Sequence, residues 1–311
     1  MNNSTIPEKP AEGEGAKKKD GGSMRRRILT AVIAIPLLIA YFYFLSGTPG
    51  MPIIVAAASC VASYELLKCV GYHKNPAVAV PTYMFAAAIP FCARRPDEQY
   101  IFLGLFFFIS FIYMFYMLSA AVMSKVAFKV EDIAVLYMME TYMIFGFTSI
   151  ILLRDMENGS LLYWLPFVSA WMTDAGGYFI GRVFGRHKLV EHISPKKTVE
   201  GAIGGVIFSV VTFVVYAFVV GLIFDVVPNY LFACVLGVII AVVSQLGDLI
   251  ASLVKRRYSI KDYGNLIPGH GGMMDRCDSV IATAPFIYLI CSLTVLLSNF
   301  FHIAPSFFLF R

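Results

Sequence analysis

Long apolar segments recur along the whole chain, and they constrain its fold more than any other feature. There are nine, each 16 to 24 residues long, at 28–46, 52–67, 77–93, 100–123, 133–153, 161–181, 202–224, 230–247 and 279–299. A helix needs about 20 apolar residues to cross the hydrocarbon core of a bilayer. Because backbone groups in lipid must be hydrogen-bonded within the chain, such segments form helices. The sequence therefore predicts an all-α, polytopic membrane helix bundle with about nine transmembrane helices.

The composition agrees with this class and excludes others. Hydrophobic residues make up 59% of the 311 residues and charged residues only 14%, whereas soluble domains carry about 25% charged residues. A disordered chain, a disulfide-rich mini-protein and a nucleic-acid-binding domain are excluded, so we expect no nucleic acid among the partners. The six cysteines show no zinc-ligand spacing and are interpreted as free thiols in the bundle.

The distribution of basic residues predicts the orientation of the bundle. Residues 1–27 are polar and are interpreted as a disordered cytoplasmic tail, because the next segment is long enough to span and no signal-peptide cleavage site follows it. With the N-terminus in the cytoplasm, 21 of the 25 Lys and Arg residues lie on cytoplasmic segments, as the positive-inside rule requires. The C-terminus is then outside, and the two longest polar loops, 182–200 and 255–278, face the cytoplasm.

Acidic residues that interrupt or border the apolar segments are candidates for function, because an ionisable group at membrane depth is costly. They are Glu65, Glu140, Asp174, Asp248, Asp275 and Asp278.

One of these acids belongs to a polar stripe on a predicted helix through 244–257. The stripe consists of Ser244, Asp248, Ser252 and Lys255. Such a stripe is suited to hold a cation near Asp248 and an anion near Lys255 and Arg256. The alternative is a helix end that extends its basic side chains into lipid headgroups, but this does not explain the acid.

The next segment is rich in glycine and ends in two acids. It contains, in order, Lys261, Asp262, Gly264, Pro268, Gly269, His270, Gly271 and Gly272. Glycines let backbone N–H groups approach phosphate oxygens closely. Asp275 and Asp278 follow on the start of a helix, with Arg276 between them. A helix N-cap explains one acid, whereas Mg2+, which favours one or two carboxylates plus substrate phosphates, explains the pair.

The other cytoplasmic loop carries hydroxyl and basic groups suited to phosphate, among them Ser194 and Lys197, and Asp174 precedes it in the sixth apolar segment. The alternative is an ordinary basic cytoplasmic loop.

These residues match a known family. Residues 252–278 fit the pattern S-x-x-K-R-x4-K-D-x-G-x2-I-P-G-H-G-G-x2-D-R-x-D at every fixed position. This stretch resembles the phosphatidate cytidylyltransferases, and the runs that begin at Asp174, Ser194 and Gln245 also resemble that family in its order. The resemblance covers roughly the C-terminal 140 residues and is of the bacterial type. Two positions depart from the usual pattern, Cys277 and Lys196, and neither removes a charged group.

The resemblance implies a dimeric membrane enzyme that converts CTP and phosphatidate to CDP-diacylglycerol and pyrophosphate with Mg2+, and it allows a second, monovalent cation such as K+. The expected location is the cell inner (plasma) membrane, with the active site facing the cytoplasm. Residues 28–160 would then be N-terminal transmembrane helices and 161–311 the catalytic region.

The same resemblance implies roles for individual residues. The implied catalytic residues are Asp248, Asp275, Asp278 and Lys255, and the three acids are also the implied metal ligands. The implied substrate-binding residues are Ser252, Arg256, Lys261, Asp262, His270, Gly271, Gly272, Arg276, Ser194, Lys197 and Asp174.

Two other classes of protein agree less well with the sequence. A transporter for a phosphorylated solute is compatible with intramembrane acids, but transporters place their sites near the midplane, whereas here the polar residues gather at the cytoplasmic ends. A CDP-alcohol phosphotransferase would carry a D-G-x2-A-R motif, which the chain lacks.

Overall fold

The computed structural model describes residue 44 and residues 48–93, 99–123, 129–156, 158–224, 227–264 and 271–301, with backbone alone at 99–100 and 295–301. The tail 1–27, almost all of the first predicted span and His270 therefore lie outside the described residues.

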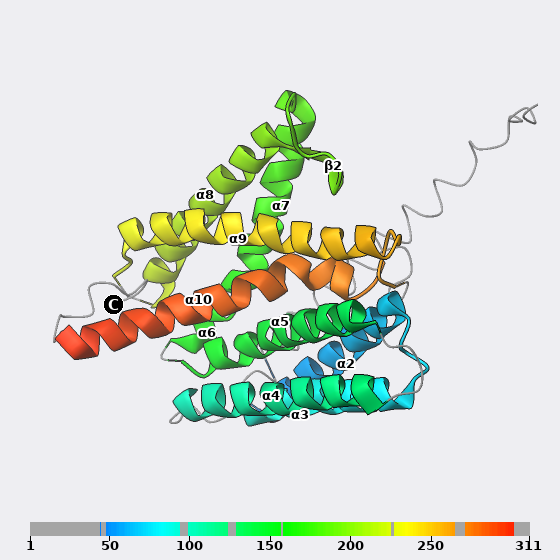
Figure 1. The fold of residues 1–311 in the computed structure, drawn as a ribbon. Helices are drawn as coiled ribbons and strands as arrows, with labels where there is room; N and C mark the ends of the chain where they lie inside the picture. Colours follow the sequence, from blue (N-terminus) through cyan, green and yellow to red (C-terminus); the bar gives the residue numbers. More distant parts are fainter. Residues whose placement is uncertain are drawn as a thin grey trace, which may run out of the picture.

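Helices dominate the described part of the chain (Figure 1). They are α2 (Gly50–Val70), α3 (Pro76–Cys92), α4 (Gln99–Met123), α5 (Val130–Arg154), α6 (Gly159–Leu162), α7 (Leu165–Phe184), α8 (Val199–Phe224), α9 (Tyr230–Arg257) and α10 (Met274–Phe301). A short antiparallel hairpin, β1 (Lys188–Val190) and β2 (Ser194–Thr198), joins α7 to α8. The predicted helical class is confirmed.

Six of the described helices are long and apolar enough to cross a membrane: α2, α4, α5, α8, α9 and α10. Helix α3 is apolar but shorter, and α7 carries both Asp174 and Arg182. The count of nine spans and the orientation of the bundle therefore stay predictions.

One predicted span differs from the structure. The segment 161–181 is divided between α6 and α7, and Pro166 lies in the first turn of α7, where its missing N–H costs little. The helix predicted through 244–257 is the end of α9, which extends to Arg257, and α10 begins at Met274, next to Asp275. Basic residues in the last turn of α9 and an acid in the first turn of α10 both favour these helix ends.

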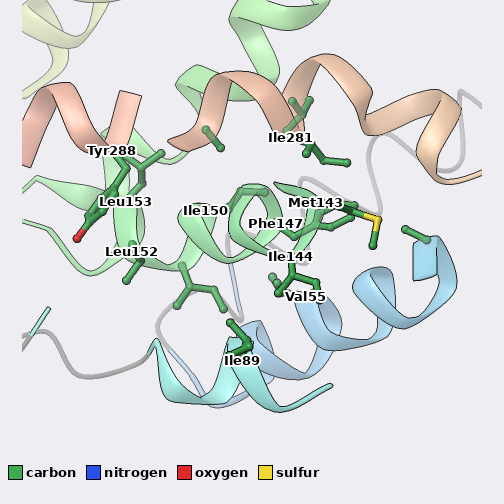
Figure 2. Close-up of a cluster of buried hydrophobic side chains, with 14 of the residues drawn as sticks. Val55, Ile89, Met143, Ile144, Phe147, Ile150, Leu152, Leu153, Ile281 and Tyr288 are labelled. Atoms are coloured by element: carbon green, nitrogen blue, oxygen red, sulfur yellow. The ribbon is translucent and has the colours of Figure 1, made fainter. Parts of the chain in front are cut away.

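Helix α5 lies at the centre of the N-terminal helices and packs against α2, α3, α4 and α10. Figure 2 shows its side chains Ile144, Phe147 and Ile150 among residues of neighbouring helices, including Val55 of α2 and Ile281 of α10. Helix α10 also packs against α7 and α9. It therefore connects the helices that precede residue 155 to those that follow it.

Helices α7 and α8 approach so closely that their backbones touch. A Cβ atom on Gly176 would lie 2.6 Å from Phe208 Cβ, and one on Gly201 would lie 2.8 Å from Gly177 O. Small residues allow this backbone contact between membrane helices. The result is a rigid helix pair that carries the hairpin at one end (Figure 1).

The junction between α5 and α10 is predicted to depend on Gly146. A Cβ at this position would lie 2.5 Å from Ile281 O and 2.9 Å from Ile281 Cα, and a backbone cannot retreat as a side chain can. We expect Gly146→Ala to lower the free energy of unfolding by about 1–3 kcal/mol, measured by thermal unfolding in detergent. Gly104→Ala in α4 is the control, because no atom lies within 4 Å of its new Cβ. Equal stability of the two variants would contradict the close junction.

Candidate functional site

The predicted site residues come from five parts of the fold. Helix α7 contributes Asp174, the hairpin contributes Ser194 and Lys197, and the loop after α9 contributes Lys261, Asp262, Gly271 and Gly272. Helix α9 contributes Asp248, Ser252, Lys255 and Arg256, and α10 contributes Asp275, Arg276 and Asp278. The structure gathers most of these residues into two polar networks that share α9.

The first network lines a cavity of about 370 Å³ between α7, the hairpin, α8 and α9. Lys197 Nζ lies 2.8 Å from Asp248 Oδ2 and donates to Gln245 O at 3.3 Å. Asp174 also lines this cavity. The residues predicted from α7, β2 and α9 are thus brought together around one hollow, although they are separated by up to 74 positions in the chain.

Three further residues of this cavity were missed by the sequence analysis as site residues: Tyr178, Arg182 and Lys196. Arg182 Nη1 donates to Tyr178 Oη at 2.9 Å. Arg182 and Lys196 belong to a predicted cytoplasmic loop that is rich in positive charge. Basic residues are expected in such a loop from the orientation of the bundle alone, so these two did not stand out as site residues. On α7, Arg182 lies one turn from Tyr178 and two turns from Asp174, and this spacing was the available signal for these two residues.

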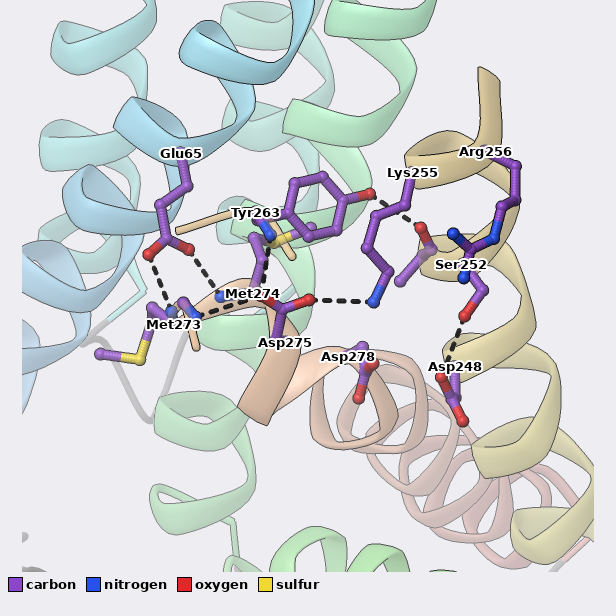
Figure 3. Close-up of polar contacts among 12 residues, drawn as sticks. Glu65, Asp248, Ser252, Lys255, Arg256, Tyr263, Met273, Met274, Asp275 and Asp278 are labelled. Carbon is purple, nitrogen blue, oxygen red and sulfur yellow. Dashed lines mark hydrogen bonds and ion pairs between the residues drawn. The ribbon is translucent and has the colours of Figure 1, made fainter. Parts of the chain in front are cut away.

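The second network surrounds Asp275 (Figure 3). Its Oδ1 accepts from Lys255 Nζ at 2.9 Å, and its Oδ2 accepts from the backbone N–H groups of Tyr263 at 2.8 Å and Gly272 at 3.1 Å. The side chains of Lys255 and Asp275 are 11% and 7% exposed, so the pair is little screened by water. Lys255 Nζ also lies 5.6 Å from the centre of the Tyr263 ring.

Tyr263 fixes the loop against α9 from the other side. Its hydroxyl donates to Ala251 O at 3.0 Å. Burial raises the pKa of Tyr263 well above its usual range, so the phenol keeps its proton and the hydrogen bond persists at high pH. The loop is therefore tied to α9 and to α10 through one residue.

Asp278 lies between the two networks (Figure 3). Its charge interacts with those of Asp248 and Asp174 and with that of Lys255. A Cβ on Gly247 would lie 2.9 Å from Asp278 O, which shows that α9 and α10 touch through their backbones here. This contact places Asp248 and Asp278 on facing helices as close, like-charged neighbours.

The remaining predicted residues lie around these networks. Ser252 Oγ donates to Asp248 Oδ1 at 3.4 Å, and Arg256 Nε donates to Ile193 O in the hairpin turn at 3.2 Å. Lys261, Asp262 and Arg276 are exposed.

The acids of the two networks are candidate ligands for a metal ion. Within the described residues, no group of three or more His, Cys, Asp or Glu side chains is arranged to hold a metal ion, and Asp275 already accepts three hydrogen bonds. Nevertheless, two buried hydroxyls lack a hydrogen-bond partner among the described residues. They belong to Thr173, on the helix of Asp174, and to Ser244, on the helix of Asp248. Carboxylates of like charge, with unpartnered hydroxyls on the same helices, fit a hard cation that is completed by substrate phosphates, rather than a cage built by protein alone.

A bundle of membrane-length helices with interleaved acids and bases at one end of α9 and α10 is the architecture of a polytopic membrane protein with a charged site. Comparison with known proteins specifies the class further. The chain belongs to the Cytidylyltransferase family, whose sequence model matches residues 25–294.

Several bacterial proteins match the chain over most of its length. The phosphatidate cytidylyltransferase of Bacillus subtilis is 32% identical over 279 residues, which is 87% of this chain and 98% of that protein. The phosphatidate cytidylyltransferase of Staphylococcus haemolyticus is 34% identical over 268 residues, 86% of this chain and 98% of that protein. That of Staphylococcus aureus is 32% identical over 269 residues, with the same coverage.

The ion pair between Lys255 and Asp275 is predicted to be a coupled unit. Lys255→Met leaves a buried carboxylate without its cation, which costs about 3 kcal/mol or more. The double variant Lys255→Met/Asp275→Asn removes that charge, so we expect it to be more stable than Lys255→Met alone. Thermal unfolding of the four combinations measures the coupling. Arg257→Gln, at an exposed position on the same helix, is the control and should change stability by less than about 0.5 kcal/mol. Additive effects of the two substitutions would contradict the pairing.

Proposed function

We propose that this protein is a phosphatidate cytidylyltransferase, which transfers CMP from CTP to phosphatidate and releases pyrophosphate. Two findings together carry the proposal. The family model matches most of the chain, and the structure places the pair of Lys197 and Asp248 in a cavity beside the charged residues Lys255, Asp275 and Asp278.

The reaction requires no nucleophilic side chain from the protein. An oxygen of the phosphatidate phosphate attacks the α-phosphorus of CTP, a new P–O bond forms, and the bond to the pyrophosphate leaving group breaks. The attacking oxygen is already anionic at neutral pH, so the protein has to neutralise charge and hold two anions in line. Lys197 and Lys255 supply positive charge from opposite sides of Asp248 and Asp278. Arg182 and Lys196, at the wall of the cavity, are positioned to take the phosphate of the lipid.

The balance of charge supports a requirement for Mg2+. The cavity wall and the two networks themselves contain four acids (Asp174, Asp248, Asp275 and Asp278) and four bases (Arg182, Lys196, Lys197 and Lys255). A triphosphate entering such a neutral site needs further positive charge. We propose that Asp248 and Asp278 hold Mg2+ together with the nucleotide phosphates, with Asp275 as a further acid of this site; bound there, the ion would polarise the phosphates and offset the charge of the leaving group. The hydroxyls of Thr173 and Ser244 also suit a monovalent cation such as K+.

The proposed setting is the bacterial inner membrane, with the site open to the cytoplasm, where CTP is available, and with the protein as a homodimer. The family resemblance supports the dimer, and the excess of Lys and Arg on one set of loops supports the orientation.

Activity is tested with purified protein, labelled CTP, phosphatidate and Mg2+, followed by extraction of a labelled lipid. Asp248→Asn and Asp278→Asn should each lower kcat/KM by roughly 10²-fold or more, since each removes a charge that holds the cation but keeps the side-chain shape. Omission of Mg2+ should abolish the product. Glu191→Gln, an exposed acid in the hairpin turn, is the matched control and should retain activity.

The variants also distinguish two roles for the acids. If Asp248 and Asp278 merely repel phosphate and bind no metal, their neutralisation should strengthen CTP binding and leave turnover intact. That result would overturn the proposed metal site, and the absence of any labelled lipid with wild-type protein would overturn the proposed reaction.

Orientation is tested with single cysteines in a cysteine-free background. Val190→Cys in the hairpin and Asp262→Cys in the loop after α9 should react with an impermeant thiol reagent from the cytoplasmic side, because both segments must reach one nucleotide. Val227→Cys, between α8 and α9, should react from the opposite side. Reaction of the first two from opposite sides would exclude a shared site.

A further inference from the structure

Glu65 has no place in the reaction as described so far, yet it is one of the few buried acids among the residues that the structure describes. It lies on α2, in the N-terminal helices, and is 3% exposed. Figure 3 shows its carboxylate directed at Met273 and Met274, at the start of α10. An acid in an apolar helix is costly unless it has a specific partner, and here the partner lies more than 200 residues further along the chain.

The partner of Glu65 is the backbone of the first turn of α10. Oε1 accepts from the N–H of Met273 and Oε2 accepts from the N–H of Met274, both at 2.9 Å. The first N–H groups of a helix have no acceptor within the helix, and a carboxylate is favourable at this positive end. Glu65 therefore caps α10 from a different helix.

Asp275 completes the same arrangement. Its Oδ2 accepts from the N–H of Gly272, so three successive N–H groups, at 272, 273 and 274, are bound by two carboxylates. The other oxygen of Asp275 accepts from Lys255. The hydrogen bonds of Glu65 thus hold the backbone segment from which Asp275 reaches Lys255, and Asp278 follows one turn later.

Two glycines of the loop pack directly on this carboxylate. A Cβ on Gly272 would lie 2.6 Å from both oxygens of Glu65, and a Cβ on Gly264 would collide with Oε1. These residues stand on either side of the segment 265–270. The close fit requires the glycines because Glu65 occupies the space that a side chain would need.

We propose that Glu65 is a positioning residue for nucleotidyl transfer: it fixes the first turn of α10 and the flanking glycines, and thereby the placement of Asp275 and Asp278. The inference rests on the proposed function for its catalytic consequence but not for its structural part. Glu65 is not among the residues that line the cavity, so its effect on the site is exerted through the start of α10 and the flanking loop glycines.

The carboxylate, rather than the volume of the side chain, carries this role. Glu65→Gln keeps the shape but offers one acceptor for two N–H groups and turns an NH2 group toward the other donor. Glu65→Asp is shorter but keeps two acceptors. If Glu65 positions α10 through hydrogen bonds, the Asp variant should retain more activity than the Gln variant, whereas simple packing predicts the reverse order.

The test combines kinetics with hydrogen–deuterium exchange on the full-length protein in detergent. We expect Glu65→Gln to lower kcat by roughly 10- to 100-fold, as small displacements of catalytic groups do, with the KM for phosphatidate little changed. Exchange of the 271–276 backbone should become faster in this variant. The control is Glu140→Gln, which removes another buried carboxylate, bound to Ser63 of α2; it should leave exchange of 271–276 unchanged.

The outcomes separate the inference from the proposed function. Faster exchange at 271–276 together with a lower kcat, in the order Glu, Asp, Gln, supports the positioning role. Wild-type exchange in Glu65→Gln, or full kcat in that variant, overturns it. A higher activity of the Gln variant than of the Asp variant also overturns it in favour of packing. If wild-type protein makes no labelled lipid, the proposed reaction fails, while the exchange experiment still decides whether Glu65 holds α10.

Discussion

The backbone N–H groups at the start of α10 have no acceptor within their own helix, and the site depends on how they are hydrogen-bonded. Such donors must find acceptors when they are buried, and here they bind the carboxylates of Glu65 and Asp275. Because Asp275 also accepts from Lys255, three helices, α2, α9 and α10, meet at one polar junction. The N-terminal helices are thus part of the structure that supports the site, although the family motifs lie elsewhere in the chain.

Helix α9 relates this junction to the cavity. Asp248 and Lys255 are seven residues apart on one continuous helix, which corresponds to about 10 Å along its axis. Asp248 binds Lys197 from the hairpin, and Lys255 binds Asp275 from α10. The separation of the two ion pairs is therefore set by helix geometry rather than by loops. Gly247, directly before Asp248, allows α10 to approach α9 there, so the charge of Asp278 interacts with that of Asp248.

The sequence predicted the features that depend on local spacing. The polar stripe on α9 is confirmed by the contact of Ser252 with Asp248, because a helical period determines which residues share a face. The hairpin was not predicted, since Ser194–Thr198 contains no alternation of apolar and polar residues. The partner of Glu65 was not predictable either, because nothing local to α2 indicates which distant N–H groups it would accept. For Asp275, both interpretations had been left open, and the structure shows the acid binding helix N-terminal donors.

The pairing of acids with lysines has a consequence for substrate binding. Lys197 and Lys255 each already have a carboxylate partner within 2.9 Å, so a phosphate that approaches either lysine competes with that carboxylate. Displacing the carboxylate would leave a poorly solvated negative charge, which is unfavourable unless another cation replaces the lysine. In the proposed reaction Asp248 would hold Mg2+ together with the nucleotide, and the charge of that ion would replace the charge of the lysine. The acids would then hold the lysines in place before the nucleotide binds and hold the cation afterwards. A purely basic pocket would supply no carboxylate for either state.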